Sequence, residues 1–308
     1  MIDKQGRTIN YLRLSVTNKC NLNCAYCKHS ADIEDVLSMD EIKKIVKLFS
    51  KVGIHKVRLT GGEPLVRDDI FEIVKICKEA EGIRDIALTT NGVLLPKMAK
   101  QLKQAGLHRV NISLDSLESG KYQKIARADS LNEVLAGVDA AIEAGLTPVK
   151  INTVLMHGVN DNEVDNFIAL TKDRDVRVRF IEYMPMGKEN DGRYISAEEI
   201  LSQRPHLQIC EEGEGVETLY QVQGYKGKVG FITPVSRPFC ENCNRIRITA
   251  DCKVRHCLGD NTETDLREIL MADDAAAEAM IKVAAEKKPA RGFCSGFVTN
   301  RGMGNIGG

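Results

Sequence analysis

No stretch of the 308-residue sequence approaches the roughly 20 consecutive apolar residues that a helix needs to cross a bilayer. Residues 1–16 also lack the apolar core of a secretion signal. Neither charge is in excess, because 43 Lys and Arg side chains balance 43 Asp and Glu side chains. No overall field therefore attracts nucleic acid or an anionic membrane, while a neutral total still allows a local basic pocket for a small anion. We expect a cytoplasmic, soluble protein built on one large α/β domain with a smaller appendage.

Low-complexity segments are absent as well, but cysteine is abundant, with ten in the chain. Without a secretion signal, a reducing compartment favours metal binding or redox chemistry over disulfide bonds. Six cysteines fall into two tight groups, whereas the others are scattered at Cys77, Cys210, Cys252 and Cys294. The two groups are therefore the first candidates for metal sites.

Strand-like and helix-like patterns alternate from about residue 10 to residue 205. The first helix-like segment starts at Ser38, where Ser38 and Glu41 have the spacing of a capping box. Strands separated by helices pair in parallel with right-handed crossovers. Six such units can form an open doubly wound sheet or most of a barrel, and the pattern alone does not distinguish the two. The six strand-like segments are 11–16, 56–60, 86–90, 109–115, 149–155 and 176–184.

The pattern changes after Pro205. Residues 217–233 alternate around glycines as antiparallel strands do, and residues 245–258 have the pattern of a hairpin. A helical segment over about 264–288 and a glycine-rich end follow. We therefore predict two regions, 1–205 and 206–308.

The first cysteine group, Cys20-x3-Cys24-x2-Cys27, follows the first predicted strand. Three thiolates at this spacing can hold one face of a 4Fe-4S cubane and leave the fourth iron open to a chelating ligand. The alternative is a structural zinc site with His29 as the fourth ligand. The spacing, and Tyr26 just before the last cysteine, resemble the signature of the radical S-adenosylmethionine (SAM) superfamily, in which SAM chelates the open iron.

The segment Thr60-Gly61-Gly62-Glu63-Pro64 ends the second predicted strand. Two glycines allow the backbone to approach a ligand closely, although a tight turn between strand and helix is the simpler interpretation of the pair. Beside the cysteine triad, GGEP resembles the motif that contacts the methionine part of SAM in the same superfamily.

The second group is Cys240-x2-Cys243-x13-Cys257, with Cys252 as a candidate fourth ligand. Spacing alone favours zinc and an iron–sulfur cluster equally. The stretch PFCENCNRIRITADCKVRHCLGDNTETDLREIL, however, resembles the C-terminal part of the GTP 3′,8-cyclases of molybdenum cofactor biosynthesis. In that family the three cysteines hold a second 4Fe-4S cluster with an open iron facing the substrate. Cys252 stands where the family usually has glycine, and we interpret it as a bystander in the hairpin turn.

The resemblance covers nearly the whole chain, including LRLSVTNKCNLNCAYC, VRLTGGEPLVRDDI, VNISLDSL, RFIEYMPMG and the terminal Gly307-Gly308. The segment after Cys27 is short for the family. The family fold implies a partial, six-stranded (β/α)6 barrel of the TIM type, with its mouth covered by the antiparallel and helical C-terminal segment.

Three predicted strands each contain one cation between apolar neighbours, namely Arg13, Arg58 and Lys150. A buried, unpaired cation is very costly, so each must meet an acceptor. Internal salt bridges to Glu182 or Asp115 are one solution. Repetition in three strands favours a shared anionic ligand inside the barrel, and arginine forks suit phosphate oxygens.

The matching positions extend over all six strands. The resemblance implies SAM contacts from Tyr26, Gly62, Ser113 and Met184. It implies GTP contacts from Arg13, Arg58, Thr89, Lys150, Arg245 and Arg247. It implies catalytic roles for Arg245, Arg247, Gly307 and Gly308, the last two in a tail that reaches the active site.

The implied reaction converts GTP to (8S)-3′,8-cyclo-7,8-dihydroguanosine 5′-triphosphate by radical chemistry from SAM and two 4Fe-4S clusters. Implied partners are an electron donor such as flavodoxin or ferredoxin and a downstream cyclic pyranopterin monophosphate synthase, with the chain as monomer or homodimer. One alternative is a radical SAM peptide maturase, which needs a peptide groove rather than a cationic interior. Another is a non-enzymatic Fe-S or zinc protein, which leaves the cations unexplained.

Overall fold

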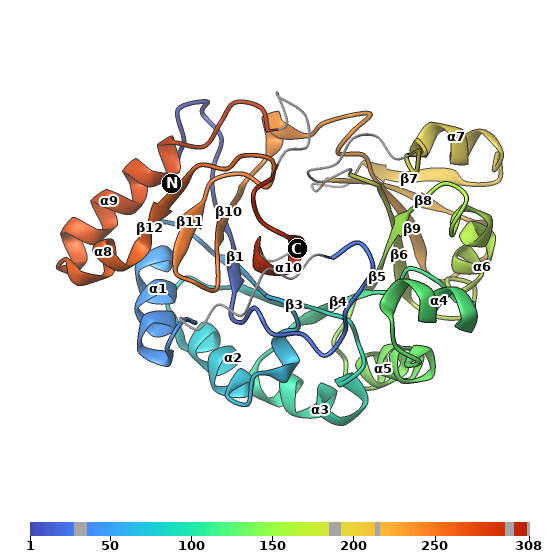
Figure 1. The fold of residues 1–308 in the computed structure, drawn as a ribbon, viewed down its shortest axis with the longest axis horizontal. Helices are drawn as coiled ribbons and strands as arrows, with labels where there is room; N and C mark the ends of the chain where they lie inside the picture. The colour runs from blue at the N-terminus through green and yellow to red at the C-terminus, as the bar shows by residue number, and fades with distance from the viewer. Residues whose placement is uncertain (28–35, 185–191, 213–215, 293–298, 307–308) are drawn as a thin grey trace.

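Six strands, each followed by at least one helix, form the central part of the fold (Figure 1). The computed structural model describes residues 1–27, 36–184, 192–212, 216–292 and 299–306. Neighbouring strands from β1 to β6 are parallel throughout. The α/β class and the six strand–helix units are therefore confirmed. The strands are β1 (Tyr11–Ser15), β2 (Lys56–Thr60), β3 (Asp85–Thr90), β4 (Arg109–Ser113), β5 (Val149–Leu155) and β6 (Val176–Glu182).

The helices lie on the outer side of the curved sheet in Figure 1. The helix after β1 starts as expected, since Ser38 and Glu41 form a reciprocal capping box and the apolar face is buried. After β4 the chain forms two helices instead of one, because a short helix precedes the predicted one. These helices are α1 (Met39–Lys51), α2 (Ile70–Glu79), α3 (Leu95–Ala105), α4 (Ser119–Ala126), α5 (Leu131–Glu143), α6 (Val164–Ala169) and α7 (Ala197–Ser202).

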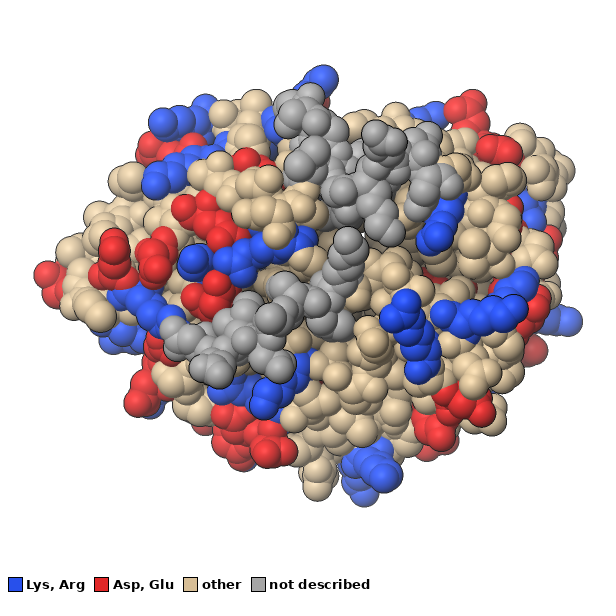
Figure 2. Space-filling view, viewed as in Figure 1, with Lys and Arg blue, Asp and Glu red and all other residues tan. Residues whose placement is uncertain are grey.

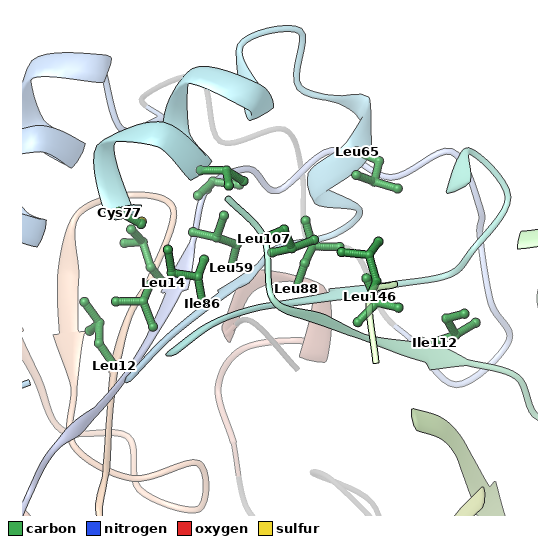
Figure 3. Packing of buried hydrophobic residues seen from close by; sticks show 14 of the residues in the cluster. Leu12, Leu14, Leu59, Leu65, Cys77, Ile86, Leu88, Leu107, Ile112 and Leu146 are labelled. Carbon is green, nitrogen blue, oxygen red and sulfur yellow. The ribbon is translucent and has the colours of Figure 1, made fainter. Parts of the chain in front are cut away.

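The apolar core fills the space between the sheet and these helices. In Figure 3, Leu14, Leu59 and Leu88 from the strands lie near Cys77 of α2 and Leu107. All five side chains are at most 1% exposed. Cys77, one of the scattered cysteines, is thus a core residue.

Strands from the C-terminal region extend both edges of the sheet. β9 (Lys228–Ile232) pairs in parallel with β6, and β10 (Arg245–Ile248) pairs in parallel with β1. The parallel part therefore has eight strands among the described residues, rather than six. Sequence reasoning missed this because edge pairing joins segments more than 50 residues apart, but it removes two edges that would expose unpaired backbone groups.

The expected hairpins flank these two strands. β7 (Gln208–Glu212) and β8 (Glu217–Gln221) continue antiparallel from β9, and β11 (Lys253–Arg255) and β12 (Glu263–Asp265) continue antiparallel from β10. The sheet order is β12-β11-β10-β1-β2-β3-β4-β5-β6-β9-β8-β7.

The C-terminal helices lie in two places. α8 (Leu266–Met271) and α9 (Asp274–Glu286) lie beside α1, where Lys47 binds Asp274 at 2.7 Å. The short α10 (Met303–Ile306) instead lies inside the curve of the sheet (Figure 1). Within the described part of the chain, no helix is long and apolar enough to span a membrane. On the face in Figure 2, basic and acidic side chains are interspersed.

Candidate active site

A cavity of about 340 Å³ lies inside the curve of the sheet. Its lining brings together both cysteine triads and most of the predicted ligand-binding residues. The lining residues among them are Arg13, Cys20, Cys24, Tyr26, Cys27, Arg58, Gly62, Thr89, Ser113, Met184, Cys240, Cys243, Arg245, Arg247 and Cys257. Lys150 is not among the lining residues, and Gly307 and Gly308 lie outside the described part of the chain.

The first triad occupies the loop after β1. The peptide N–H of Leu22 donates to Cys20 Sγ at 3.4 Å, and the N–H of Ala25 donates to the carbonyl of Ile125 at 2.8 Å. Burial, followed by the nearby Asp115 carboxylate, raises the pKa of the Cys24 thiol to about 12. Burial raises the pKa of Cys27 to about 11. Without a metal these groups are neutral thiols, and iron would have to displace their protons.

The two glycines of the GGEP segment pack closely against the backbone that leads into this loop. A Cβ at Gly61 would overlap the carbonyl oxygen of Thr17, and a Cβ at Gly62 would lie 2.7 Å from the carbonyl oxygen of Asn18. The N–H of Gly62 donates to Thr17 O at 2.9 Å. The close approach that the glycines allow is therefore to the segment just before Cys20, and Gly62 faces the cavity as well.

Glu63 of the same segment has a role that sequence reasoning missed. Its fully buried carboxylate accepts hydrogen bonds from Asn91 N at 2.6 Å, Thr90 Oγ1 at 2.8 Å and Leu65 N at 3.0 Å. Burial raises its pKa to about 7. Asn91 in turn lies 3.9 Å from Cys20 Sγ, so Glu63 couples the end of β3 to the first triad.

The residues predicted to contact SAM line the same cavity as the first triad. The Tyr26 hydroxyl donates to Asp115 Oδ2 at 2.5 Å, and Asp115 Oδ1 accepts from Val154 N at 2.8 Å. Ser113 ends β4, and strand carboxyl ends are where barrel enzymes place reacting groups. Both oxygens of the Asp115 carboxylate therefore accept hydrogen bonds, from Tyr26 and Val154, and Asp115 does not pair with any of the strand cations.

Three arginines form a row across neighbouring strands. Arg13 on β1 is the register partner of both Arg247 on β10 and Arg58 on β2. Burial, followed by repulsion from Arg247 and Arg58, holds the pKa of Arg13 well below its usual range. Burial and Arg245 lower the pKa of Arg247 to about 10. Each arginine in the row raises the free energy of keeping its neighbours charged and buried. A bound polyanion would offset this repulsion, so the row is a site for a polyanion.

Several buried polar atoms of the described cavity-lining residues lack a hydrogen bond, including the Oγ1 of Thr60 and the Nδ1 of His256. Among the described residues, the Nε of Arg58 and the Oγ1 of Thr89 are buried without a hydrogen bond. Buried donors are normally satisfied, so each orphaned atom marks a ligand position. Both residues line the cavity.

Lys150 has a different environment, because its Nζ lies 3.2 Å from Glu217 on β8. Arg177 at 2.8 Å and Arg179 at 3.5 Å share the same carboxylate. Burial alone would raise the pKa of Glu217, but the three cations have the larger effect and lower this pKa to about 2. One carboxylate does not neutralise three cations, so burial and Arg179 still lower the pKa of Lys150 to about 7. The internal salt bridge considered from the sequence thus exists at Lys150, with Glu217 instead of Glu182 or Asp115.

Arg179 lines the cavity and was missed from the sequence. The signal was present, since Val178-Arg179-Phe180 repeats the pattern of a cation between apolar neighbours. Its Nε donates to Asn152 Oδ1 at 2.8 Å.

The second triad lies at the basic side of the cavity. Cys240 begins a single 3-10 turn after β9, Cys243 caps the end of that turn, and Cys257 follows β11. Burial alone would raise the pKa of Cys243, but Arg245 and Lys288 lower it to about 6. The Cys243 thiol therefore deprotonates far more readily than the thiols of Cys24 and Cys27 in the first triad.

Cys252 occupies the turn of the β10–β11 hairpin and packs in the apolar core at 0% exposure. Its φ of 62° is left-handed, a conformation that glycine adopts at no steric cost. Cys252 is absent from the lining of the cavity as far as the structure describes it. The bystander interpretation fits this placement, whereas Cys294 and His29 lie outside the described residues.

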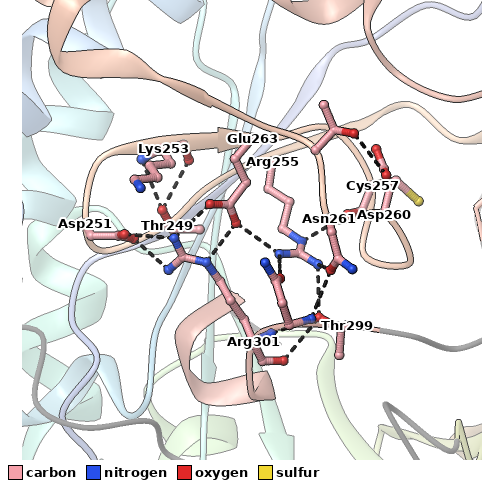
Figure 4. Close-up of polar contacts among 12 residues, drawn as sticks. Thr249, Asp251, Lys253, Arg255, Cys257, Asp260, Asn261, Glu263, Thr299 and Arg301 are labelled. Carbon is pink, nitrogen blue, oxygen red and sulfur yellow. Dashed lines mark hydrogen bonds and ion pairs between the residues drawn. The ribbon is translucent and has the colours of Figure 1, made fainter.

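An ion-pair network joins the second triad to the C-terminal residues (Figure 4). Arg255 donates to the carbonyl of Cys257 at 3.3 Å and to Glu263 Oε1 at 3.0 Å. Glu263 and Asp251 together bind Arg301, each at 2.8 Å. Three residues farther along, the N–H of Gly304 donates to the sulfur of Cys27. The C-terminal segment therefore contacts the first triad while it is fastened beside the second.

These residues fit iron–sulfur clusters and an anionic nucleotide. A structural zinc site takes four donors, whereas each of the two groups supplies three cysteines. A cubane takes one thiolate at each of three irons, and each triad presents three thiols to one cavity. The fold and the site thus define an α/β protein with two cysteine triads and a cationic interior.

Family models match this chain in two consecutive parts. Residues 14–171 match the model described as the radical SAM superfamily, and residues 176–293 match the model described as Molybdenum Cofactor Synthesis C. Among solved structures, SuiB of Streptococcus suis has a TM-score of 0.62 at 15% identity, covering 93% of this chain and 68% of that one. At that identity the likeness shows the fold alone.

The match of the family model to more than half of the chain therefore makes the protein a radical SAM protein. Curated relatives define the family more closely. The GTP 3′,8-cyclases of Alkaliphilus oremlandii and Petrotoga mobilis are 44% and 43% identical to it, each over the full length of both chains. The chain belongs to the GTP 3′,8-cyclase family.

Proposed function

We propose that the protein converts GTP to (8S)-3′,8-cyclo-7,8-dihydroguanosine 5′-triphosphate in the first step of molybdenum cofactor biosynthesis. One observation carries the proposal: the row Arg247–Arg13–Arg58 faces the same cavity as both cysteine triads. A peptide substrate supplies no comparable set of negative charges for this row. A triphosphate does.

We assign one 4Fe-4S cluster to Cys20, Cys24 and Cys27, and a second to Cys240, Cys243 and Cys257. Tyr26, Gly62, Ser113 and Met184 line the same cavity as the first triad, and in this proposal they would hold SAM. When bound, the first cluster and SAM supply a carbon-centred radical that abstracts hydrogen.

The arginine row orients the nucleotide. Its guanidinium forks bind the phosphate oxygens and so hold the ribose at a fixed distance from the first triad. Arg58 Nε and Thr89 Oγ1 are free to donate to it. Lys150 belongs to the proposed set as well, and it would contact GTP by exchanging Glu217 for a phosphate oxygen.

The C-terminal segment closes the site. Met303 and Gly304 already line the cavity, and we propose that Gly307 and Gly308 continue into it as catalytic residues together with Arg245 and Arg247. Exclusion of water protects reactive intermediates from side reactions. In this proposal residues 1–205 hold SAM and residues 206–308 supply the second cluster and close the site.

The further partners are proposed on chemical grounds. A one-electron donor such as flavodoxin or ferredoxin would reduce the first cluster, and a cyclic pyranopterin monophosphate synthase would consume the product. The nine described cysteines are free thiols, as in the cytoplasm. We propose a monomer or homodimer.

Anaerobic reconstitution with iron and sulfide, followed by GTP, SAM and dithionite, tests the proposal. We expect about eight irons per chain, 5′-deoxyadenosine, and a product isomeric with GTP by mass spectrometry. Arg58→Met should bind iron and SAM normally but lose the nucleotide product, whereas Arg84→Met, an exposed arginine, should match the wild type. Deoxyadenosine formation that GTP does not affect, with no isomeric product, would reject the substrate.

A further inference from the structure

Arg7 lies in a tight loop at the N-terminus, far in sequence from both triads. Asp3 Oδ1 accepts from the N–H groups of Gln5 and Arg7, and Asp3 Oδ2 binds Arg7 Nε at 2.6 Å. Both charged side chains are buried, at 6% and 7% exposure. The Asp3–Arg7 pair is therefore a fixed, desolvated unit. Arg7 Nη2 donates locally to Gln5 Oε1 at 3.1 Å, and the two Nη groups also donate to distant partners.

Those donors bind backbone carbonyls more than 230 residues away. Arg7 Nη1 donates to Cys240 O at 2.9 Å and to Ala290 O at 3.2 Å. Arg7 Nη2 donates to Pro289 O at 2.8 Å and to Lys288 O at 3.4 Å. A single guanidinium thus joins the first cysteine of the second triad to residues 288–290.

Residues 288–292 in turn touch the rest of that triad. Lys288 Nζ donates to the carbonyls of Arg245 at 2.8 Å and His256 at 2.9 Å, and it hydrogen bonds Cys243. Gly292 passes so close to Cys257 that a Cβ there would overlap the sulfur. We name residues 288–292 the strap.

We propose that Arg7, held by Asp3, is a positioning residue for the second iron–sulfur cluster: it fastens the strap against Cys240, Cys243 and Cys257. The inference rests on the proposed assignment of a cluster to this triad. Nothing in the radical SAM signature or the cysteine spacing points to Arg7, because its partners are carbonyl groups, which leave no trace in a sequence pattern.

Removing the guanidinium has a defined physical effect. Arg7→Met keeps much of the side-chain volume but removes the guanidinium donor from four carbonyls and from Asp3 Oδ2, while Asp3 Oδ1 keeps its two backbone N–H donors. The strap then loses its attachment to Cys240, and the second triad is exposed to solvent and oxidants. The first triad is held by Gly61, Gly62 and Glu63 instead, so it should be unaffected.

The test separates the clusters by using two backgrounds. With Cys20, Cys24 and Cys27 replaced by Ala, only the second cluster can assemble; with Cys240, Cys243 and Cys257 replaced by Ala, only the first can. Arg7→Met, Arg7→Lys and Asp3→Asn are placed in each background, and iron, sulfide and the EPR signal of the reduced cluster are measured. Arg204→Met is the matched control, since Arg204 is also buried, binds Asp165 at 2.7 Å and donates to Ile200 O at 3.0 Å away from the cavity.

We expect Arg7→Met to reduce second-cluster iron from about four per chain toward none, with first-cluster iron unchanged. Arg7→Lys and Asp3→Asn should give intermediate iron and a faster loss of the cluster in air. In the second-cluster background, equal iron with and without the Arg7→Met change would overturn this inference but would leave the proposed function standing. Equal losses in both backgrounds, or the same loss in Arg204→Met, would show a general folding role and overturn it too. If the unmutated second-cluster background binds no iron, the cluster assignment itself fails, and the inference with it.

Discussion

Arg13 on β1 and Arg247 on β10 are register partners in neighbouring parallel strands. The two strands come from opposite ends of the chain, and only the edge pairing of β10 places the second arginine beside the first. Arg58 continues the row on the other side of Arg13. Like charges held together in a buried site destabilise the protein without ligand, and such a cost is typical of a binding site.

Replacing Arg247 with Met should separate stability from binding. Removing one of three repelling cations should leave the melting temperature of the ligand-free protein unchanged or raise it by about 2–4 °C. The rise in melting temperature on adding GTP should disappear, because the phosphates lose a fork. Thermal unfolding with and without GTP measures both, with Arg84→Met as the control. A GTP-induced shift equal to that of wild type would contradict the role of the row.

Gly61→Ala should abolish the first cluster selectively. Its φ of 154° disfavours side chains, and the new Cβ would overlap the carbonyl of Thr17, which precedes the triad. We expect a loss of about 2–4 kcal/mol in the free energy of unfolding and loss of first-triad iron. The control is Gly120→Ala, where a Cβ meets no atom within 4 Å and helix α4 should gain about 0.5–1 kcal/mol. Full iron content in Gly61→Ala would disprove this support of the loop.

Glu217→Gln should change the pH dependence of stability. The folded pKa of Glu217 is about 2, below its usual value of 4.5, so its contribution is present above about pH 4.5 and is lost as the pH falls toward 2. At neutral pH the Gln variant should be roughly 3 kcal/mol less stable, since three cations lose their shared carboxylate. Urea unfolding between pH 3 and pH 7 should show the difference shrinking at acid pH. The control variant Glu81→Gln, at an exposed position, should show no difference in stability from wild type at any pH. A stability difference for Glu217→Gln that stays constant from pH 3 to pH 7 would refute the explanation.

Cys252 should be dispensable for iron. We expect Cys252→Ala to keep about eight irons and Cys257→Ala to lose about four. At the left-handed φ of 62°, Cys252→Gly should be about 1 kcal/mol more stable than Cys252→Ala. Iron analysis and urea unfolding of the three variants measure both effects. Loss of iron in Cys252→Ala would make Cys252 a ligand of the second cluster.

Much of the fold and of the candidate site could be predicted from local patterns in the sequence. The Ser38–Glu41 capping box and the six strand–helix units are set by nearby residues, and the structure confirms them. The cysteine triads were located by spacing, and the alternation around Arg13 and Arg58 indicated a cationic interior. Arg179 obeyed the same alternation and could have been found by it.

The rest depends on partners that are distant in the sequence. Glu217 binds Lys150 and Arg177 across 67 and 40 positions, and no local pattern marks it as their acceptor. Arg7 binds carbonyls 233 to 283 positions away. β9 and β10 look like ordinary hairpin strands until the free edges of β6 and β1 are known. Such features follow from the packed fold and not from any one segment.

The central claim is that the arginine row holds the ribose of GTP where hydrogen can be abstracted from its 3′ carbon. GTP deuterated at the ribose 3′ position, incubated anaerobically with the reconstituted protein, SAM and dithionite, tests this directly. The account predicts one deuterium in the 5′-deoxyadenosine formed, by mass spectrometry. Deoxyadenosine without deuterium, formed alongside converted nucleotide, would contradict it.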